Sequence, residues 1–416
     1  MPLIPLADVQ AAIFGAVTPL EPVAVNLRDA RGLVLAEQVT APEAVPPFPN
    51  TAMDGYAVRA ADTTAAGEGA PVRLRVVGEL AAGHAPTTAV GEGEAIRIMT
   101  GAPMPDGADA IVMVERTERD PSSDDGDDGV LITLAVGPGL HVRRAGGDLE
   151  AGDVVFEPGT VLTPARVGVL ATVGARRVRA HPRVRVGVLS TGDELVETGP
   201  LAPGKIRDSN RPMLLAQLAD AGAEPLDLGS AHDDADVMTR TLSDAVSQCD
   251  AVITSGGVSV GDFDYVSDAL ERIARDDASG ASRVDWYQVA IKPAKPLCIG
   301  MLRGTPVFGL PGNPVSSFVS FELFARPALR MIMGHDHPFR REVLATAASP
   351  MRRRVDGKLH LDRVVVDVVD GAYVATSVRS QESNALAASA AANAFALLPD
   401  GEGVDIGDPV RVMLLD

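Results

Sequence analysis

Hydrophobic and polar positions along residues 183–334 predict strands and helices in turn. Four short apolar runs, each closed by Gly, Ser or Asp, predict buried strands: RVGVLS, PLDLGSA, DAVITSGG and TPVFGLPG. Segments with the helical period separate them: NRPMLLAQLADAG, DADVMTRTLSDAVSQ and DFDYVSDALERIA. Strand followed by helix, repeated, predicts a mostly parallel sheet covered on both faces. Such sheets bind their ligands at the carboxyl ends of the strands.

The segments on either side predict β-rich structure. Residues 20–180 contain short alternating runs such as PVRLRVVGEL and EAIRIMTG, separated by Gly and Pro. Residues 338–416 repeat this character in KLHLDRVVVDVVDGAYVATSV and DPVRVMLLD, and one predicted helix, SNALAASAAANAFALLP, interrupts it. PSSDDGDDG is predicted to be a solvated hairpin loop, and a first helix is expected to place Leu6, Val9, Ile13 and Val17 on one stripe.

Composition narrows the class of protein. The chain has 416 residues, enough for two to four domains, and 46% of them are hydrophobic. A net charge of −19 argues against binding to nucleic acid or to an anionic membrane. We find neither an apolar run of transmembrane length nor a credible secretory signal. Cys249 and Cys298 lie outside metal or redox spacings, which suits a cytoplasmic protein.

Lysine is rare, which draws attention to one pair. Of the 37 basic residues 33 are arginine, and two of the four lysines, Lys292 and Lys295, lie three residues apart in IKPAKP. Residues that precede proline avoid the helical region, so the segment is predicted to be extended. Two ammonium groups there can offset the charge of an oxyanion, although coincidence is the simpler alternative.

The stretch SGGVSVGDFDYV allows three interpretations. Gly256 and Gly257 follow a buried strand and precede a helix, so their backbone N–H groups can approach an oxyanion. A tight turn with Asp262 capping the helix would explain the glycines equally well, but capping leaves Asp264 unexplained. Residues 257–261 also match the G-x-S-x-G nucleophile elbow, with Ser259 as the nucleophile of a serine hydrolase.

Carboxylates follow several of the predicted strands. Each alone is explained as a helix cap or a loop residue, but a parallel sheet would gather them at one edge. Mg²⁺ prefers such oxygen ligands together with substrate phosphates, so the group predicts a magnesium site. Its members are Asp193, Glu194, Asp208, Asp233, Asp234 and Asp264. In FGLPGNPVSSF, Asn313 is predicted to cap a helix that begins at Pro314, with Ser316 and Ser317 pointing into the same cleft.

Several segments taken together resemble the MoeA family, the molybdopterin molybdenumtransferases that include the E domain of gephyrin. They fall in order from about residue 46 to 320, with a weaker C-terminal match. These segments are PPFPNTAMDGYAVRAAD, RIMTGAPMPDGADAIVMVE, AGGDLEAGDVVFEPGTVLTP, STGDEL, DSNR, TSGGVSVGDFDYV, IKPAKP and GLPGNPVSS.

The resemblance implies a Mg²⁺-dependent enzyme that inserts molybdate into adenylated molybdopterin and releases AMP. It implies a homodimer whose active cleft lies between the α/β domain of one subunit and a β-domain of the other, and a possible contact with the molybdopterin adenylyltransferase. It also implies an elongated chain with a central MogA-like α/β domain and flanking β-domains. We therefore predict a helical and extended linker domain (1–45 with 142–180), a β-rich domain (46–141), an α/β domain (181–335) and a C-terminal β-barrel-like domain (336–416).

Matching the family motifs residue by residue predicts the site. Asp54 and Thr100 would lie on the β-domain that faces the partner's cleft. The predicted catalytic residues are Asp54, Thr100, Asp148, Glu194, Asp233 and Asp264, and the predicted metal ligands are Glu194, Asp234 and Asp264. The predicted substrate-binding residues are Gly256, Gly257, Ser259, Lys292, Lys295, Pro311, Asn313, Ser316, Arg363 and Ser383.

Three positions depart from the family pattern, and rival functions stay open. Pro49 replaces a common acidic residue, Ala294 replaces the usual glycine between the lysines, and Asn384 stands where small residues or His are commoner. Ala294 is expected to restrict the backbone before Lys295. The rivals are a scaffold or storage protein that binds a pterin or a protein partner without turnover, the serine hydrolase, and the preceding adenylyl transfer. Molybdate and tungstate, both tetrahedral dianions, fit equally.

Overall fold

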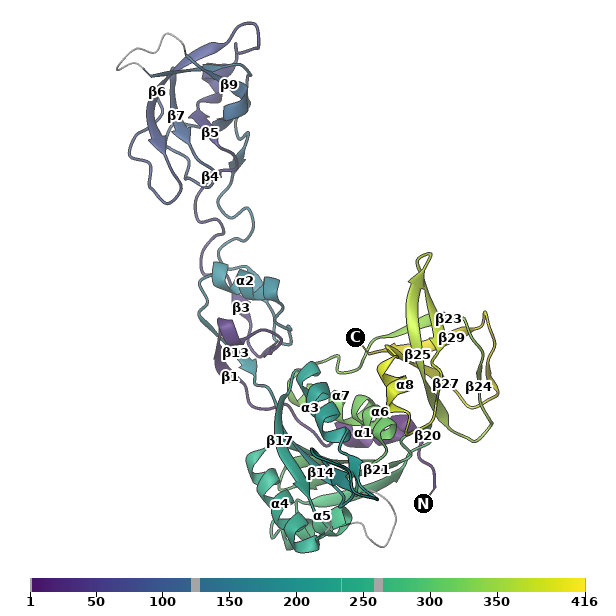
Figure 1. The fold of residues 1–416 in the computed structure, drawn as a ribbon. Coiled ribbons are helices and arrows are strands. Elements are labelled where there is room, and N and C mark those ends of the chain that lie inside the picture. Colours follow the sequence, from purple (N-terminus) through teal and green to yellow (C-terminus); the bar gives the residue numbers. More distant parts are fainter. Residues whose placement is uncertain (1, 121–127, 233, 258–264, 416) are drawn as a thin grey trace. The chain divides into compact units, whose positions relative to one another are not determined.

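The computed structural model describes residues 2–120, 128–232, 234–257 and 265–415. The chain divides into two compact units. Unit 1 comprises residues 1–24, 32–36 and 179–416, and unit 2 comprises residues 25–31 and 37–178. Each unit is described by itself below (Figure 1). The four-domain division stays a prediction.

Unit 1 is built on a six-stranded sheet with the order β17-β14-β18-β22-β21-β19. The first four strands are parallel, as predicted, and β21 and β19 add an antiparallel edge that the sequence analysis missed. In sheet order the strands are β17 (Glu224–Ala231), β14 (Arg185–Thr191), β18 (Ala251–Ser255), β22 (Thr305–Leu310), β21 (Pro296–Leu302) and β19 (Arg283–Gln288).

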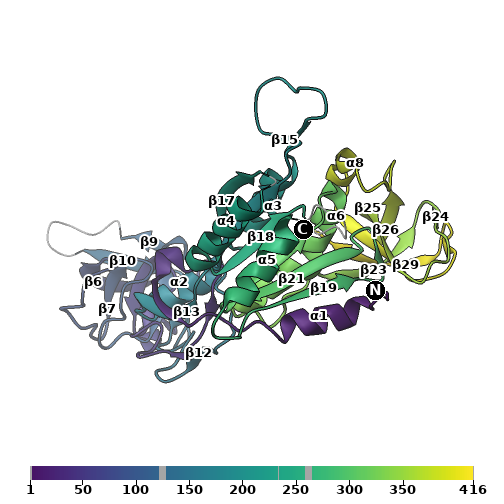
Figure 2. The same ribbon diagram turned by 90° about the horizontal axis from the view of Figure 1, so that it is seen from below.

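Helices cover both faces of this sheet, as the alternating pattern predicted. On one face, α1 (Leu6–Phe14), α3 (Asn210–Asp220), α6 (Pro314–Ser320) and α7 (Arg326–Ile332) pack around Val186, Val188 and Ile253. On the other face, α4 (Ala235–Gln248) and α5 (Tyr265–Asp276) pack around Leu189, Val252 and Val307. A short π-helix, Phe321–Ala325, joins α6 to α7. A two-stranded arm of β15 (Leu195–Val196) and β16 (Ile206–Arg207) projects beside the sheet (Figure 2).

The C-terminal part of unit 1 is a second six-stranded sheet, with the order β20-β25-β26-β23-β29-β27. Because β27 also pairs with β25, five of the strands close on themselves and leave β20 attached outside. The strands are β20 (Ile291–Lys292), β25 (Leu359–Val369), β26 (Ala372–Ser377), β23 (Glu342–Ala347), β29 (Pro409–Leu414) and β27 (Ala394–Leu398). A small pair, β24 (Met351–Arg352) and β28 (Gly403–Val404), lies beside them.

One predicted helix is wrong in its second half. The segment SNALAASAAANAFALLP forms a short helix, α8 (Leu386–Ala390), and then strand β27. All five residues of β27 are buried, and the strand pairs with β25 on one side and β29 on the other. These pairings and this burial outweigh the helix propensity of the alanines.

Unit 2 contains a third six-stranded sheet, with the order β8-β5-β7-β6-β10-β9. The strands are β8 (Ala110–Met113), β5 (Gly55–Val58), β7 (Glu94–Ile98), β6 (Val72–Leu80), β10 (Gly129–Ile132) and β9 (Thr117–Arg119). β9 and β10 pair in antiparallel, as expected on either side of a hairpin loop, but most of the predicted loop lies outside the described residues. The β-rich character predicted for this part is confirmed.

The remaining elements are short. Unit 2 has one α-helix among its described residues, α2 (Pro164–Thr172), and three 3₁₀ turns, Leu27–Asp29, Ala60–Thr63 and Val114–Arg116. The other strands are β1 (Val23–Asn26), β2 (Val34–Leu35), β3 (Val39–Thr40), β4 (Asn50–Thr51), β11 (Val142–Arg143), β12 (Val154–Phe156) and β13 (Arg177–His181). Within the described ranges, every helix is too short or too polar to cross a lipid bilayer.

Candidate active site

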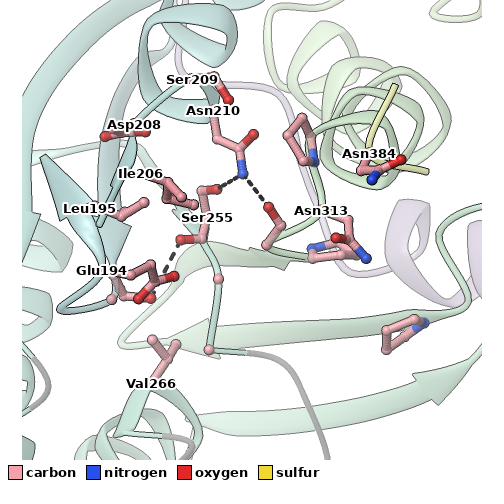
Figure 3. Close-up of a pocket in the computed structure, with 18 of the residues that line it drawn as sticks. Glu194, Leu195, Ile206, Asp208, Ser209, Asn210, Ser255, Val266, Asn313 and Asn384 are labelled. Carbon is pink, nitrogen blue, oxygen red and sulfur yellow. Dashed lines mark hydrogen bonds between the residues drawn. The ribbon is translucent and has the colours of Figure 1, made fainter. Parts of the chain in front are cut away.

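A cavity of about 880 Å³ opens in unit 1 at the carboxyl ends of three parallel strands (Figure 3). Thr191 ends β14, Ser255 ends β18, and Pro311 follows β22, and all three line the cavity. This is the position where open α/β sheets bind ligands. Among the predicted site residues, the lining includes Glu194, Gly256, Gly257, Lys295, Pro311 and Asn313.

The turn after β18 consists of Gly256 and Gly257, is called the glycine turn below, and requires glycine at both positions. Gly256 has φ +96° and Gly257 has φ +69°, both in the left-handed region. A Cβ on Gly256 would lie 2.9 Å from Oγ1 of Thr191, so the turn also packs tightly against the end of β14. Residues 258–264 lie outside the described residues, so the roles of Ser259 and Asp264 stay predictions.

Asn210 joins two walls of the cavity, and the sequence analysis did not single it out. Its Nδ2 donates to Oγ of Ser255 at 2.8 Å and to the carbonyl oxygen of Gly312 at 2.7 Å (Figure 3). A carbonyl oxygen can only accept, so the contact with Gly312 fixes which atom of the amide is nitrogen. The asparagine side chain therefore holds the turn after β22 against the end of β18.

The predicted acidic residues have diverse surroundings. Glu194 is exposed and lines the cavity. Asp234 caps α4, because its Oδ1 accepts from the backbone N–H groups of Asp236 at 3.0 Å and Val237 at 2.8 Å. Asp193 pairs with His232 at 3.1 Å. Asp233 lies outside the described residues.

Asp208 lines the cavity but is paired with a cation that the sequence analysis missed. Its Oδ2 accepts from Nε of the buried Arg211 at 3.1 Å. The same guanidinium donates to Asp227 at 2.5 Å and to Glu197. Burial lowers the pKa of Arg211, but its hydrogen bonds to Asp227 and Asp208 outweigh that effect and raise the pKa above its ordinary value. Asp208 is thus part of a structural ion-pair network at the cavity wall.

Lys292 and Lys295 are both exposed but are placed differently. Lys295 lines the cavity, whereas Lys292 belongs to β20 and lies opposite His360 of β25. Ala294, between them, has φ +74°, a value that favours glycine. The expectation that a non-glycine residue restricts the backbone here therefore has a structural basis.

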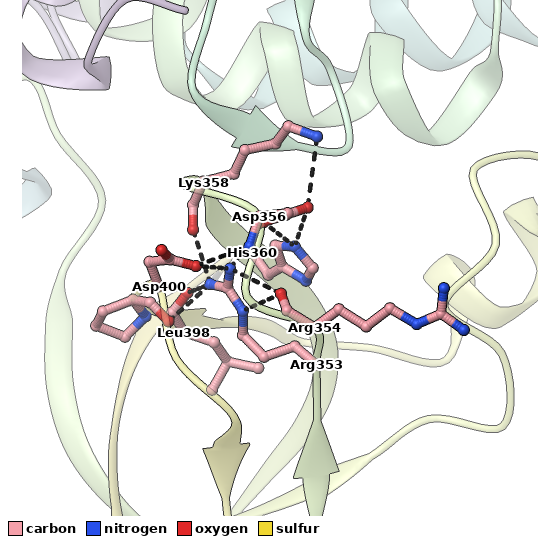
Figure 4. A network of polar contacts seen from close by, with 8 residues as sticks. Arg353, Arg354, Asp356, Lys358, His360, Leu398 and Asp400 are labelled. Atoms are coloured by element: carbon pink, nitrogen blue, oxygen red, sulfur yellow. Dashed lines mark hydrogen bonds and ion pairs between the residues drawn. The ribbon is translucent and has the colours of Figure 1, made fainter.

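A network around Arg353 anchors the start of β25 (Figure 4). This is the end of β25 that pairs with β20, where His360 lies opposite Lys292. The Arg353 side chain is fully buried and donates to the carbonyl oxygens of Lys358 at 2.7 Å and Leu398 at 2.8 Å. It also pairs with Asp356 at 2.8 Å, and Asp356 in turn lies 3.2 Å from Nε2 of His360. The strand against which β20 pairs is therefore held by charge-assisted hydrogen bonds.

The remaining predicted binding residues surround the start of α6. Asn313 occupies the N-cap position and Pro314 begins the helix, as predicted, but the Asn313 side chain makes no capping hydrogen bond. Ser316 is buried in the first turn. The carbonyl oxygen of Ser383 accepts from the backbone N–H of Val315 at 3.2 Å, and the neighbouring Asn384 lines the cavity.

Arg363 is buried in the C-terminal sheet, with 1% of its surface exposed. Its Nε donates to Oε1 of Gln381 at 3.2 Å, and its Nη2 donates to the carbonyl oxygen of Ser380 at 3.0 Å. Burial lowers the pKa of this guanidinium. The side chain thus holds the loop that leads to Ser383, and its predicted contact with molybdate stays a prediction.

In unit 2, two predicted residues meet. Oδ1 of Asp54 accepts from both the backbone N–H and the Oγ1 hydroxyl of Thr100, each at 2.6 Å. These hydrogen bonds hold the pKa of Asp54 below its ordinary value, the hydroxyl contributing most. We call the two residues the Asp54–Thr100 pair. Asp148 is exposed elsewhere in the same unit.

The donors at the cavity fit a magnesium ion that is shared with a phosphate. Such an ion uses one or two protein carboxylates and completes its shell with substrate and water oxygens. Glu194 supplies an exposed carboxylate in the cavity wall. Three or more metal-ligating side chains do not cluster anywhere in the described part of the chain, so an ion held by protein groups alone has no basis among those residues.

Comparisons with known proteins show to which family this chain belongs. The chain matches the MoeA N-terminal region (domain I and II) over residues 4–174, a probable molybdopterin binding domain over residues 187–331, and the MoeA C-terminal region (domain IV) over residues 349–415. It is 43% identical over 356 residues to molybdopterin molybdenumtransferase 2 of Mycobacterium tuberculosis, which covers 85% of each chain. The chain belongs to the MoeA family.

Other members of the MoeA family match over greater lengths. The molybdopterin molybdenumtransferase of Bacillus subtilis is 35% identical over 395 residues, which cover 94% of this chain and 89% of the relative. A MoeA protein from Pyrococcus horikoshii OT3 has a TM-score of 0.79 at 29% identity and covers 99% of this chain and 100% of its own. The family and the mixed α/β and β-rich fold class predicted from the motifs are confirmed.

Proposed function

We propose that this chain inserts molybdate into adenylated molybdopterin, releases AMP, and requires Mg²⁺. The transferase activity itself is supported by relatives 32–43% identical, all named molybdopterin molybdenumtransferase. The observation that carries the proposal is the cavity at the strand ends, which places Glu194, Lys295 and the glycine turn around one space. A carboxylate that can share a cation, an ammonium group and the backbone N–H of Gly257 are groups that suit a phosphate-bearing substrate.

We assign the following roles to the described residues of the cavity. Lys295 would bind an oxyanion through charge-assisted hydrogen bonds. In the glycine turn, the backbone N–H of Gly256 donates to the carbonyl oxygen of Leu310 at 3.0 Å. The backbone N–H of Gly257 would therefore be the one that meets a phosphate at the head of this strand-turn-helix unit. Bound Mg²⁺ would neutralise charge on the phosphoanhydride, with Glu194 as its protein ligand. Cleavage then depends on positioning and charge stabilisation rather than on a protein nucleophile.

We further propose that a second subunit completes the site. The Asp54–Thr100 pair is exposed and held in one geometry by two short hydrogen bonds, as expected for groups that meet a ligand outside their own unit. In this proposal Asp54 and Thr100 of one subunit reach the cavity of its partner in a homodimer. The protein would act in the cytoplasm, where it can receive adenylated pterin directly from the adenylyltransferase.

The test is to incubate the chain with adenylated molybdopterin, molybdate and Mg²⁺ and to measure AMP release and pterin-bound molybdenum. We expect both products together, and neither after removal of Mg²⁺ with a chelator. Tight pterin binding without AMP release would overturn the proposal in favour of a scaffold protein. AMP release that is indifferent to chelation would remove the magnesium requirement.

A further inference from the structure

Arg97 lies beside the Asp54–Thr100 pair and has an unusual set of neighbours. It belongs to β7 and lies opposite Tyr56 of β5 in the antiparallel register. Its guanidinium lies 6.0 Å from the centroid of the Tyr56 ring, and Nη1 donates to the phenol oxygen at 3.5 Å. Stacking on an aromatic face fixes a guanidinium plane while leaving most of its donors available.

Neighbouring arginines in the same sheet behave differently. On β6, Arg73 pairs with Asp120 at 2.5 Å and Arg75 pairs with Glu94. Glu79 of β6 lies opposite Arg97, yet no carboxylate in the described part of the chain lies within 4.0 Å of the Arg97 guanidinium. The side chain is exposed and turns toward Tyr56 instead. An exposed arginine whose guanidinium contacts a tyrosine rather than a carboxylate is suited to bind an external anion.

The strand register places this cation next to the predicted catalytic carboxylate. Gly55 pairs with Ile98 and Tyr56 with Arg97, so Asp54, just before β5, and Thr100, just after β7, lie at the same end of the two strands. The positive charge of Arg97 also contributes to the lowered pKa of Asp54, after the hydrogen bonds from Thr100. Arg97 therefore supplies positive charge where Asp54 would otherwise repel an anionic substrate.

We propose that Arg97 is a further substrate-binding residue, which holds a phosphate oxygen of adenylated molybdopterin beside Asp54 and Thr100. This inference rests on the proposed function, because that substrate carries the phosphates. A planar guanidinium offers two parallel N–H donors to a phosphate, an arrangement that an ammonium group cannot reproduce.

The experiment compares Arg97→Gln, Arg97→Lys and Arg75→Gln in the full chain. Arg75 is the matched control, because it lies in the same sheet and is paired with Glu94. Steady-state AMP release gives kcat and KM for adenylated molybdopterin, and calorimetry gives its Kd. For Arg97→Gln we expect KM and Kd to rise roughly tenfold to hundredfold, with kcat within about twofold. Arg97→Lys should recover part of the loss, and Arg75→Gln should match the unaltered chain.

Two outcomes would overturn the inference while leaving the proposed function intact. One is an unchanged KM and Kd in Arg97→Gln. The other is a fall in kcat alone, with the acid limb of the pH profile displaced, which would mean that Arg97 acts only through Asp54. If the unaltered chain binds adenylated molybdopterin without releasing AMP, the proposed function fails, but the Kd values still test Arg97. If the unaltered chain does not bind it, both fail.

Discussion

The cavity of unit 1 and the Asp54–Thr100 pair of unit 2 present predicted site residues in two different ways. In the cavity the backbone is tightly specified by positive-φ glycines and by the Asn210 amide, whereas Glu194 and Lys295 are exposed side chains on its wall. In the pair, the side chains themselves are specified by two hydrogen bonds of 2.6 Å. The cavity thus provides a shaped space, and the pair provides a preorganised carboxylate.

This difference indicates where each region is vulnerable. Replacing a side chain in the cavity wall should remove a ligand contact but leave the shape intact. In unit 2, a change in the backbone should disturb the carboxylate, because Asp54 directly precedes β5 and Thr100 follows shortly after β7. Each prediction below tests one side of this contrast.

The largest effect is expected from Gly55→Ala in unit 2. An added Cβ would overlap the carbonyl oxygen of Val112 and lie 2.9 Å from its carbon, because β5 and β8 approach closely at this point. We expect the β5–β8 region to lose roughly 2–4 kcal/mol of stability, measured as amide hydrogen exchange in that sheet. Trp286, the single tryptophan, lies in unit 1, so its fluorescence reports on the unfolding of that unit. The unfolding transition followed by this fluorescence should be unchanged.

The control for this prediction is Gly78→Ala. Gly78 belongs to β6 of the same sheet, and a Cβ there would meet no heavy atom within 4 Å. Its exchange rates should change little. Equal losses in the two variants would mean that the close approach of β5 to β8 is not what requires glycine.

Lys295→Ala should have the next largest effect and should act on the reaction rather than on stability. Loss of a charge-assisted hydrogen bond to an oxyanion is expected to lower kcat/KM for AMP release roughly tenfold to hundredfold. Lys292→Ala should lower it less, because Lys292 is not part of the cavity lining. Lys358→Ala, at a lysine that pairs with Asp356, is the control and should leave kcat/KM unchanged. A larger loss at Lys292 than at Lys295 would contradict the assignment of the cavity as the oxyanion site.

Thr100→Val tests the preorganised carboxylate through its pH dependence. The hydroxyl and the backbone N–H of Thr100 both stabilise ionised Asp54, so its pKa lies below the ordinary value and the carboxylate persists to lower pH. Valine removes the hydroxyl, so the pKa of Asp54 should rise and the acid limb of kcat/KM should move to higher pH. At neutral pH we expect a roughly twofold to tenfold loss. Thr100→Ser keeps the hydroxyl and should keep the acid limb in place; a displaced limb in the serine variant would argue against this mechanism.

Much of the fold was predictable because buried hydrophobic residues recur with a regular spacing along helices and strands. The parallel strands β14, β17, β18 and β22 and helices α3, α4 and α5 lie where the hydrophobic pattern placed them. The pattern did not resolve the segment of β21, whose continuous apolar run lacks any alternation, or the boundary inside the Ala-rich segment that ends in β27. Pairing with other strands decides both cases: β21 pairs with β19 and β22, which lie close to it in the sequence, and β27 pairs with β25 and β29. A local hydrophobic period carries no information about such pairing.

The sequence suggested which residues form the candidate site, but it did not reveal the partners that hold some of them in place. The structure brings Asp54 into contact with Thr100, and it places Glu194, Lys295 and the glycine turn around one cavity. The roles of these residues in the reaction stay predictions. The pairing of Asp208 with Arg211 joins residues three positions apart, a local spacing that was overlooked, whereas the further partner Asp227 comes from a different strand. Likewise, the contact of Asn210 with Gly312 joins residues 102 positions apart. Partners such as Asp227 and Gly312 depend on the folded arrangement and leave no local signal.

The smallest effect on stability is expected from Ala294→Gly. Ala294 adopts a left-handed backbone conformation (φ +74°) that glycine tolerates better than alanine. A left-handed conformation costs a non-glycine residue about 1–2 kcal/mol, and Ala294→Gly relieves that cost. Glycine also adds about 0.4–1 kcal/mol of unfolded-state entropy, and removal of the buried methyl group costs about 0.8 kcal/mol. These terms nearly cancel, so the free energy of unfolding, measured by urea unfolding followed through Trp286 fluorescence, should change by less than about 0.8 kcal/mol.

The informative quantity is the difference from Ala290→Gly. Ala290 lies four residues earlier and is not among the residues with positive φ, so glycine there brings the entropy cost without any relief. We expect that variant to lose about 1 kcal/mol. Equal losses at the two positions would mean that the left-handed conformation before Lys295 carries little strain. The restriction that alanine imposes beside the cavity would then lie in the unfolded chain rather than in the folded backbone.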